Sequence, residues 1–276
     1  MSKYSAPAIP ALLLVGCGKM GAALLSGWLE RGLARRYLVV EPAPGDLPIL
    51  RRPEVEPLAA PEQIPLDFET GVIVLAVKPQ VMQEALFPYR RFAGKGTLFL
   101  SIAAGKTLRF FARHLGERAS VIRAMPNTPA AIGRGIAVAC PNAAAAPAQR
   151  ALAERLLAAV GEVGWVEDEA LLDAVTAVSG SGPAYVFLLI ECLAQAGVEA
   201  GLPEALATRL ARATVAGAGE LARLSKESAA ALRTAVTSRG GTTEAALEVL
   251  MGKNGLDKLM SRAVLAATKR SRELAD

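Results

Sequence analysis

The sequence predicts an α/β protein in which a doubly wound parallel sheet is followed by an all-α domain. In the first part of the chain, short apolar runs alternate with stretches of helical periodicity, as is typical of a parallel sheet covered by helices. After Trp165 no segment has a convincing strand pattern, and apolar residues recur at spacings of three and four between Val186 and Leu193. We therefore expect one domain over residues 1–167 and a second over residues 168–276.

Seven segments are expected to form strands because they are short, apolar and bounded by turn residues. They are Ala11–Val15, Tyr37–Val40, Val72–Val77, Thr97–Ile102, Val121–Ala124, Gly135–Ala139 and Glu162–Val166. The last two have the weaker pattern and are expected to complete the sheet. The helices of this domain are expected at Met20–Trp28, Val81–Phe92, Leu108–Leu115 and Ala148–Val160.

Proline and glycine mark the helix ends of the second domain. Pro183 and Pro203 are expected in the first turns of two helices, where a missing N–H is tolerated. Gly201 and Gly255 are expected to end helices.

The composition of the chain disfavours several classes of protein. With 276 residues, 52% of them hydrophobic, it can bury a sizeable core. The net charge is +5, but the basic residues form scattered pairs such as Arg35-Arg36, without the basic block of a nucleic-acid binder. We therefore expect no nucleic-acid partner, whereas a small anionic ligand is compatible with the charge.

The three cysteines indicate a reducing compartment. Cys17, Cys140 and Cys192 are far apart and form no CxxC pair, so neither a disulfide framework nor a zinc site is expected. No cluster of Asp, Glu, His or Cys has the spacing of metal ligands, and we expect no metal. The cytoplasm fits these features best.

Two membrane-related alternatives were considered. The stretch ending Leu14-Val15-Gly16-Cys17 is similar to a lipoprotein cleavage box, but Pro7 and Pro10 interrupt the apolar run before it. No run approaches the roughly 18 apolar residues of a spanning helix. We expect no membrane partner.

A glycine-rich hexapeptide carries the strongest functional signal. Gly16-Cys17-Gly18-Lys19-Met20-Gly21 matches G-x-G-x-x-G between a strand and a helix, the arrangement that binds the pyrophosphate of a dinucleotide in Rossmann-type domains. Glu41 follows at the end of the next strand, where a carboxylate accepts hydrogen bonds from the ribose 2′-hydroxyl and repels a 2′-phosphate. NADH is therefore favoured over NADPH. NADPH stays open, because Pro42 follows Glu41 and Arg51 or Arg52 is near enough in sequence to reach a phosphate.

Further cofactor contacts are expected where later strands end, at the carboxyl edge of the sheet. The segment Ala76-Val77-Lys78-Pro79 closes one strand, and Lys78 is either catalytic or has a positional or solvated role. Small residues in Ile102-Ala103-Ala104 would let a nicotinamide lie against the backbone. Met125 and Asn127 belong to the rigid segment Met125-Pro126-Asn127-Thr128-Pro129, which is either a ligand contact or an ordinary turn.

Two segments at helix starts suit a carboxylate ligand. Ser179–Pro183 and Ser238–Thr243 each place small residues and free N–H groups at a helix N-terminus. Acyl-transfer triads are unsupported, because the only histidine, His114, lies in an amphipathic segment of the first domain.

Taken in order, these segments resemble Δ1-pyrroline-5-carboxylate reductases from Leu12 almost to the C-terminus. The residues that carry the resemblance are Gly16–Gly21, Ala76–Pro79, Met125–Pro129, Ser179–Tyr185 and Ser238–Thr243. The resemblance implies reduction of 1-pyrroline-5-carboxylate to L-proline with NADPH or NADH, the last step of proline biosynthesis. It also implies a cytoplasmic homo-oligomer, a dimer through the C-terminal helices that is often built into a decamer.

The same resemblance assigns roles to individual residues. The backbone of Gly240, Gly241, Thr242 and Thr243, in the loop that begins at Ser238, would hold the substrate carboxylate together with the Thr243 hydroxyl. Thr176 resembles the hydroxyl residue near the imine nitrogen and is the catalytic candidate, and Glu227 resembles an acidic residue near the same site.

Two positions depart from the family pattern. Arg239 stands where the family usually has proline, which either loosens the carboxylate loop or adds a cation beside it. Glu41 stands where many NADPH-preferring members have a small hydroxyl residue.

The expected chemistry is hydride transfer to the imine carbon, with a proton for the nitrogen from solvent or through Thr176. Alignment of the reactants can supply about 7 to 11 kcal/mol of such catalysis. Two alternatives stay open. One is a reductase of another small imine or keto acid, and the other is a non-catalytic sensor that binds the dinucleotide.

Overall fold

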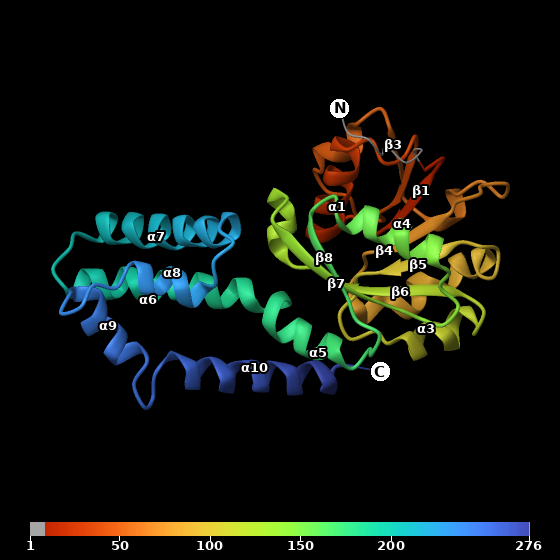
Figure 1. Cartoon of the computed structure of the whole chain (residues 1–276). Helices are drawn as coiled ribbons and strands as arrows, with labels where there is room; N and C mark the ends of the chain where they lie inside the picture. Colours follow the sequence, from red (N-terminus) through yellow and green to blue (C-terminus); the bar gives the residue numbers. More distant parts are fainter. Residues whose placement is uncertain (1–8, 276) are drawn as a thin grey trace. The chain divides into compact units, whose positions relative to one another are not determined.

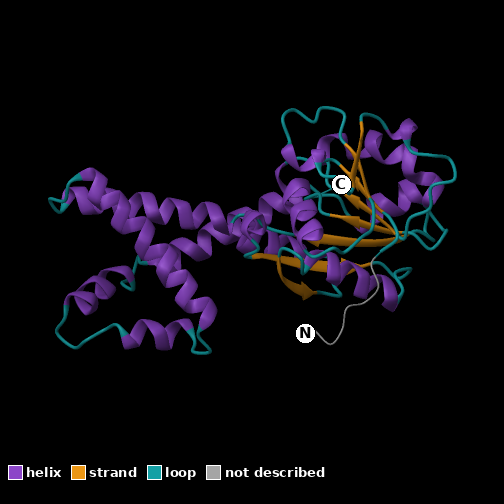
Figure 2. Cartoon of the chain, turned by 90° about the horizontal axis from the view of Figure 1, so that it is seen from above, coloured by secondary structure: helices purple, strands orange, loops and turns teal. Residues whose placement is uncertain are grey.

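The computed structural model describes residues 9–275 and divides the chain into two compact units (Figure 1). The first unit runs to Gly180 and also takes in the chain from Thr268 onward, and the second unit is Ser181–Ala267. Figure 2 shows that the strands belong to the first unit and that the second unit is helical. Pro7, which bears on the lipoprotein alternative, lies outside the described residues.

The first unit is built on an eight-stranded sheet with the strand order β3-β2-β1-β4-β5-β6-β7-β8. The strands are β1 (Leu12–Val15), β2 (Tyr37–Val40), β3 (Val55–Leu58), β4 (Val72–Leu75), β5 (Leu98–Ser101), β6 (Ser120–Met125), β7 (Gly135–Pro141) and β8 (Gly161–Trp165). The chain leaves β1 toward β2 on one side and later returns to β4 on the other. This reversal at β1 is the switch point at which doubly wound sheets bind ligands.

The sheet is not parallel throughout, which corrects one expectation. Strand β7 pairs antiparallel with β6, whereas every other neighbouring pair is parallel. The reason is the length of the connection: only the short segment around η5 (Thr128–Ile132) separates β6 from β7. A parallel crossover needs a dozen or more residues, so the chain turns back instead.

Strand β3 was not predicted from the sequence. It contains Pro57, which lacks the N–H that a central strand needs. The strand lies at the edge of the sheet, where β2 is its only partner among the described residues, with Val39 opposite Pro57. An edge position tolerates the proline.

Helices cover both faces of the sheet, and the alternation of side chains along each strand feeds both layers. From β1, Leu12 and Leu14 enter one core and Leu13 and Val15 enter the other. The first core lies under the helices α1 (Lys19–Glu30) and α4 (Pro147–Leu157) and the second under α2 (Met82–Leu86) and α3 (Leu108–Leu115). In the first core, the Trp28 indole donates a hydrogen bond of 2.9 Å to the Leu156 carbonyl.

The stretch Val81–Phe92, expected to be helical, is helical but does not form one continuous helix. The structure has three short pieces there, namely η3 (Pro79–Val81), α2 and η4 (Phe87–Phe92). Pro88 lies at the start of the last piece and cannot continue the hydrogen-bond ladder of an α-helix. Two other short 3-10 helices, η1 (Pro48–Arg51) and η2 (Pro61–Gln63), flank β3.

The C-terminal part of the chain is helical, as expected. Its elements are α5 (Leu171–Val175), η6 (Thr176–Gly180), α6 (Gly182–Glu199), α7 (Glu204–Leu224), α8 (Ala229–Ala235), α9 (Thr242–Leu250) and α10 (Leu256–Glu273). Pro183 lies in the first turn of α6 and Pro203 is the N-cap residue of α7. Gly201 has a φ of +97° just after α6, as a helix-ending glycine requires.

Gly255 does not end a helix, contrary to expectation. Helix α9 has already ended at Leu250, and Gly255 directly precedes α10. A Cβ on Gly255 would overlap the Leu250 carbonyl oxygen. The glycine is therefore required for a close backbone approach between two helices rather than for a helix stop.

The compact units divide at a different place from the expected domain boundary near Asp168. The last strand ends at Trp165, but α5 and η6 remain with the first unit, in which Leu172 and Ala177 are buried. The end of α10 also belongs to this unit, where the Ser271 hydroxyl donates a hydrogen bond of 2.7 Å to Asp173.

Candidate dinucleotide and substrate site

The glycine-rich loop follows β1 and leads directly into α1. Gly16 has a φ of +89°, and a Cβ there would lie 2.9 Å from both the Ala76 carbonyl oxygen and Val77 Cγ1. A Cβ on Gly21 would overlap the Gly16 carbonyl oxygen. These two glycines therefore permit close packing of the loop, the helix and the end of β4.

Gly18 has a different role, because it faces open space. It is the N-cap residue of α1, and apart from its neighbours along the chain no atom of the described residues lies within 4 Å of where its Cβ would be. The first N–H groups of α1 point toward this end of the helix, which attracts anions. The loop thus combines a packed base with an open rim at which a pyrophosphate can approach the backbone.

Glu41, for which the sequence predicts a contact with the ribose, lies beside this loop. One of its carboxylate oxygens, Oε2, accepts a hydrogen bond of 2.7 Å from the Cys17 backbone N–H. The other, Oε1, accepts one of 3.1 Å from the Ala43 N–H. The carboxylate is therefore fixed at the carboxyl end of β2 and stays partly exposed.

The side chains between the glycines differ in their surroundings. The Cys17 thiol is buried, and burial together with the nearby Glu41 carboxylate raises its pKa to about 11. Met20 packs against the core, whereas Lys19 is exposed. Cys17 and Met20 are thus structural through their side chains, and the loop offers a ligand mainly its backbone.

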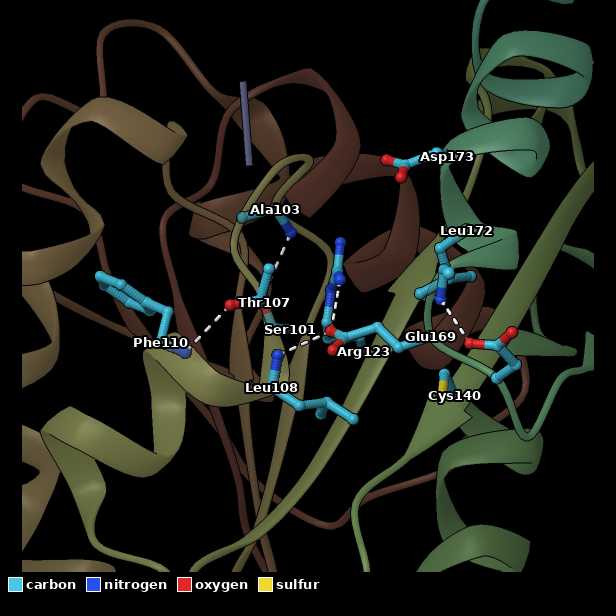
Figure 3. A network of polar contacts seen from close by, with 12 residues as sticks. Ser101, Ala103, Thr107, Leu108, Phe110, Arg123, Cys140, Glu169, Leu172 and Asp173 are labelled. Carbon is cyan, nitrogen blue, oxygen red and sulfur yellow. Dashed lines mark hydrogen bonds and ion pairs between the residues drawn. The ribbon is translucent and has the colours of Figure 1, made fainter. Parts of the chain in front are cut away.

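The ends of β4 and β5 continue the same edge of the sheet. The Ala76 N–H donates to the Val15 carbonyl at 2.8 Å, and the Ile102 N–H donates to the Leu75 carbonyl at 3.1 Å. Ala103 is buried, with its N–H 3.3 Å from the Ser101 hydroxyl oxygen (Figure 3), and Ala104 is exposed. Of these residues Ala103 is enclosed and Ala104 is open to solvent, so a ligand at this edge would meet Ala104 first.

Lys78 and Pro79 follow at the end of β4. Lys78 is exposed and precedes η3, whose first residue is Pro79. This placement suits a solvated lysine at the rim of the site.

Two of the predicted residues, Met125 and Thr176, meet at Gly180. A Cβ on Gly180 would lie 2.5 Å from Met125 Cε and 3.7 Å from Thr176 Cγ2. Thr176 begins η6, a single π-helical turn of a kind found frequently at functional sites. Its hydroxyl donates a hydrogen bond of 2.7 Å to the Leu172 carbonyl.

Asn127 has a structural contact. Its side-chain oxygen accepts a hydrogen bond of 2.9 Å from the Ile136 N–H, which ties the start of β7 to the segment that follows β6. The amide oxygen is therefore already engaged within the fold.

A partly buried ion pair near this site was not predicted. Arg123 on β6 pairs with Glu169, which precedes α5, and the same carboxylate oxygen accepts a hydrogen bond of 2.6 Å from the Leu108 N–H (Figure 3). The signal in the sequence was a charged residue inside the apolar run Val121–Ala124, which requires a partner when buried. The sequence did not identify that partner.

The expected carboxylate loop, Ser238–Thr243, lies in the second unit and forms a tight turn. The Gly241 N–H donates to the Ser238 carbonyl at 3.0 Å, and Gly240 has a φ of +70°. Gly241 is the N-cap residue of α9, and a Cβ there would lie 2.5 Å from Ser238 Oγ. Thr242 and Thr243 therefore form the first turn of α9, with the helix N–H groups beside them.

Two acidic residues of the second unit also bear on this prediction. Glu244 accepts a hydrogen bond of 2.6 Å from the Gly240 N–H and so stabilises the turn. Glu227 is exposed between α7 and α8, and its N–H donates to the Ser225 hydroxyl oxygen at 3.0 Å. The role of Glu227 stays a prediction.

The geometry fits a dinucleotide cofactor. One edge of the doubly wound sheet brings three features together. They are the open N-terminus of α1, the fixed carboxylate at the end of β2, and the small residues at the ends of β4 and β5. Within residues 9–275, no group of His, Cys, Asp and Glu side chains is arranged to hold a metal ion. These features define a nicotinamide-dinucleotide-dependent oxidoreductase with an additional helical unit.

Comparison with known proteins specifies the family. A family model for pyrroline-5-carboxylate reductase dimerisation matches residues 169–274, and one for NADP oxidoreductases, coenzyme F420-dependent, matches residues 11–105. A pyrroline-5-carboxylate reductase of Pseudomonas aeruginosa is 39% identical over 97% of this chain and 97% of its own length. One of Synechocystis is 40% identical over 95% and 97%, respectively. The chain belongs to the pyrroline-5-carboxylate reductase family.

Solved structures agree with this assignment. The pyrroline-5-carboxylate reductase of Coxiella burnetii, 33% identical, superposes with a TM-score of 0.87 over 96% of this chain and 98% of its own. That of Plasmodium falciparum, solved with NADP bound, is 27% identical, with a TM-score of 0.81 over 97% and 98%.

Proposed function

We propose that this protein reduces 1-pyrroline-5-carboxylate to L-proline with NAD(P)H, the last step of proline biosynthesis. The observation that carries the proposal is the glycine-rich loop beside Glu41, in a chain that matches pyrroline-5-carboxylate reductases over almost its whole length. In this proposal the substrate is a small cyclic imine that carries a carboxylate.

The first unit provides the cofactor site. The backbone from Gly16 to Gly21 would hold the pyrophosphate at the start of α1. Residues Ala76–Pro79, Ile102–Ala104, Met125 and Asn127 would face the nicotinamide half. When bound, the reduced nicotinamide supplies the hydride.

Thr176 would hold the imine nitrogen. Its own proton is directed at the Leu172 carbonyl, so the oxygen can present lone pairs to another donor. A protonated imine nitrogen is such a donor. In this role Thr176 fixes the position of the nitrogen and its proton, and alignment supplies most of the catalysis.

The second unit would supply the carboxylate site. The N–H groups at the start of α9, in the loop from Ser238 through Gly240 and Gly241, and the hydroxyl of Thr243 suit a negatively charged ligand. The exposed Glu227 is assigned near the same site on the family resemblance alone.

For the cofactor we propose a preference for NADH. The Glu41 carboxylate is held in place by the Cys17 and Ala43 N–H groups, so it would meet the adenosine ribose without rearrangement. A 2′-phosphate at this position would be repelled by the fixed negative charge.

We also propose a homodimer, on which the decamer of the family resemblance would be built. Many apolar side chains of α6 are exposed in the single chain, among them Val186, Phe187, Leu188, Leu189 and Leu193. The family model for dimerisation covers this helix. A second copy of the chain would bury these side chains.

The same helical stretch corrects one expectation from the sequence. By length and composition alone, Leu171–Glu199 qualifies as a candidate membrane span. Its most apolar stretch of 18 residues has a mean hydropathy of 1.5, and 6% of that stretch is buried. A dimer interface explains this hydropathy without a membrane. We propose a cytoplasmic location, which the three free thiols support. Cleavage of a lipoprotein leader before Cys17 would also remove β1 from the middle of the sheet, and this argues against export.

The test follows oxidation of NADH and of NADPH in parallel, each with and without 1-pyrroline-5-carboxylate. The expected result is oxidation that depends on the substrate and is faster with NADH. Cofactor binding without oxidation would support a sensor. Oxidation only with another imine or keto acid would replace the proposed substrate.

A further inference from the structure

We propose that Glu169 is a positioning residue for this reaction, which fixes the segment carrying Thr176 against the strand and helix that border the nicotinamide side. The inference rests on the proposed function, because it assigns Glu169 an effect only through Thr176. Glu169 itself touches neither substrate nor cofactor in this proposal.

The contacts of Glu169 join three parts of the first unit. Its carboxylate accepts a hydrogen bond of 2.6 Å from the Leu108 N–H and forms the ion pair with Arg123 (Figure 3). The Arg123 side chain is 11% exposed and that of Glu169 is 28% exposed. A charged hydrogen bond in such surroundings is strong, and the loss of either partner leaves the other without compensation.

Each partner is close to a segment proposed to face the nicotinamide. Leu108 is the first residue of α3, which follows the loop from Ile102 to Ala104. Arg123 lies on β6 two residues before Met125, so the two side chains share one face of the strand. Glu169 therefore connects both of these segments to the start of α5.

The far end of the same segment is held by β6 as well. Met125 packs against Gly180, the last residue of η6, beside Thr176. The stretch from Glu169 to Gly180 is thus attached to β6 at its start by the ion pair and at its end by Met125. Thr176 lies between the two attachments.

A third contact acts on α5 itself. Asp173, one turn after Glu169, accepts a hydrogen bond of 2.7 Å from Ser271, and Arg272 lies 3.7 Å from the same carboxylate. The segment around Leu274 also packs beside the loop that contains Ile102–Ala104 and Gly105. A Cβ on Gly105 would lie 2.8 Å from the Leu274 carbonyl oxygen. Polar contacts therefore hold α5 in place on two sides.

The consequence is a fixed place for the Thr176 hydroxyl relative to β6. A misplacement of about 1 Å in a reacting group can cost roughly a hundredfold in rate. Glu169→Gln removes the ion pair but keeps an oxygen that can accept from Leu108. We expect this variant to lose about tenfold or more in kcat, with the Kd for NADH changed less than about twofold.

The experiment is a double-mutant cycle of Glu169→Gln with Thr176→Ala, measured as kcat with NADH and 1-pyrroline-5-carboxylate. If Glu169 acts through Thr176, the Glu169→Gln change costs little once Thr176 is alanine. Equal losses in both backgrounds, or full turnover by Thr176→Ala, would overturn the proposal. A wild-type protein without turnover would instead reject the proposed function.

Two further variants separate positioning from folding. Glu167→Gln is the matched control, because Glu167 lies only two residues before Glu169. The change removes an exposed ion pair with Arg150 and should leave kcat unchanged. Arg123→Lys keeps the charge and should lose less kcat than Glu169→Gln. If Glu169→Gln lowers Tm strongly, Arg123→Lys replaces it in the cycle, and additive losses there would equally overturn the proposal.

Discussion

The carboxylate of Glu41 accepts a hydrogen bond of 2.7 Å from the backbone N–H of Cys17, 24 residues earlier in the chain. The residue that would choose the cofactor is thus joined to the loop that would bind it. Because the contact is part of the fold, the carboxylate is preorganised rather than recruited by the ligand, and the cost of ordering it is already met.

The first prediction concerns cofactor choice. Glu41→Ser should lower kcat/KM for NADH by about tenfold to a hundredfold, because a hydrogen bond to a charged group contributes about 1.5 to 3 kcal/mol. The same change should raise kcat/KM for NADPH, since the repulsion of the 2′-phosphate is lost. Glu62→Gln, an exposed acidic residue on η2, is the control. An unchanged NADH to NADPH ratio in Glu41→Ser would refute the assignment.

The second prediction separates two glycines of the same loop. Gly18→Ala should leave Tm nearly unchanged, because the backbone is extended and the added methyl group meets open space. It should nevertheless raise the Kd of NADH about tenfold, a loss of roughly 1.4 kcal/mol in pyrophosphate contact. Fluorescence titration of bound NADH measures this effect.

Gly21→Ala should behave in the opposite way. Its methyl group would overlap the Gly16 carbonyl oxygen, and such overpacking costs about 1 to 3 kcal/mol of stability. A thermal scan in which Gly18→Ala and Gly21→Ala lower Tm by the same amount would contradict this prediction. It would mean that Gly18 is as closely packed as Gly21.

The third prediction concerns Arg239. It occupies the second position of the turn from Ser238 to Gly241, and Gly240 at the third position has positive φ, as in a type II turn. Proline is favoured at that second position. Arg239→Pro should therefore raise the free energy of unfolding by about 0.4 to 1 kcal/mol and Tm by about 1 to 4 °C.

The KM for 1-pyrroline-5-carboxylate then decides what the arginine does. A lower KM in Arg239→Pro means that the natural arginine loosens the carboxylate loop. A higher KM means that its cation attracts the substrate. Arg233→Ala, an exposed cation on α8, controls for the general loss of charge.

The fourth prediction is a loss of stability at alkaline pH. Burial raises the pKa of Cys17 and of Cys140 from an ordinary value of 9.0 to about 11. Between these values the unfolded chain loses its thiol protons and the folded chain keeps them, so the thiol contribution to stability is constant below about pH 9 and falls from there toward pH 11. Urea unfolding at pH 8 to 10.5 measures the fall.

A double variant, Cys17→Ala with Cys140→Ala, isolates the thiol contribution. Its free energy of unfolding should fall less steeply above pH 9 than that of the natural chain. Parallel curves for the two proteins would show that other groups cause the alkaline loss.

The sequence predicted the fold well where local pattern and position in the sheet agree. The apolar runs at Leu12–Val15 and Tyr37–Val40 are central strands and were found as such. Strand β3 was missed because Pro57 argues against a strand unless its edge position is known. The helical stretch expected at Val81–Phe92 was found, but its division into short pieces was not predicted, because the apolar periodicity masked the break that Pro88 imposes.

The candidate site could be predicted where its residues follow one another at a characteristic spacing in the sequence. The glycine-rich loop and Glu41 follow from a known spacing, and the structure brings them together. Glu169 was not predictable, because its partner Arg123 is 46 residues away and only the sheet brings the two within reach. Arg123 itself was the available signal, as a charge within a buried strand.

The return of Thr268 and the following residues to the first unit has a consequence for biosynthesis. Domains emerging from the ribosome generally fold as units, N-terminal part first. Here Ser271 and Leu274, which are translated more than a hundred residues after the last strand, contribute to the unit that holds the sheet. A nascent chain that stalls within α10 would carry a complete sheet with α5 anchored on one side only, so the first unit is completed only after Thr268 and the residues that follow it have been translated.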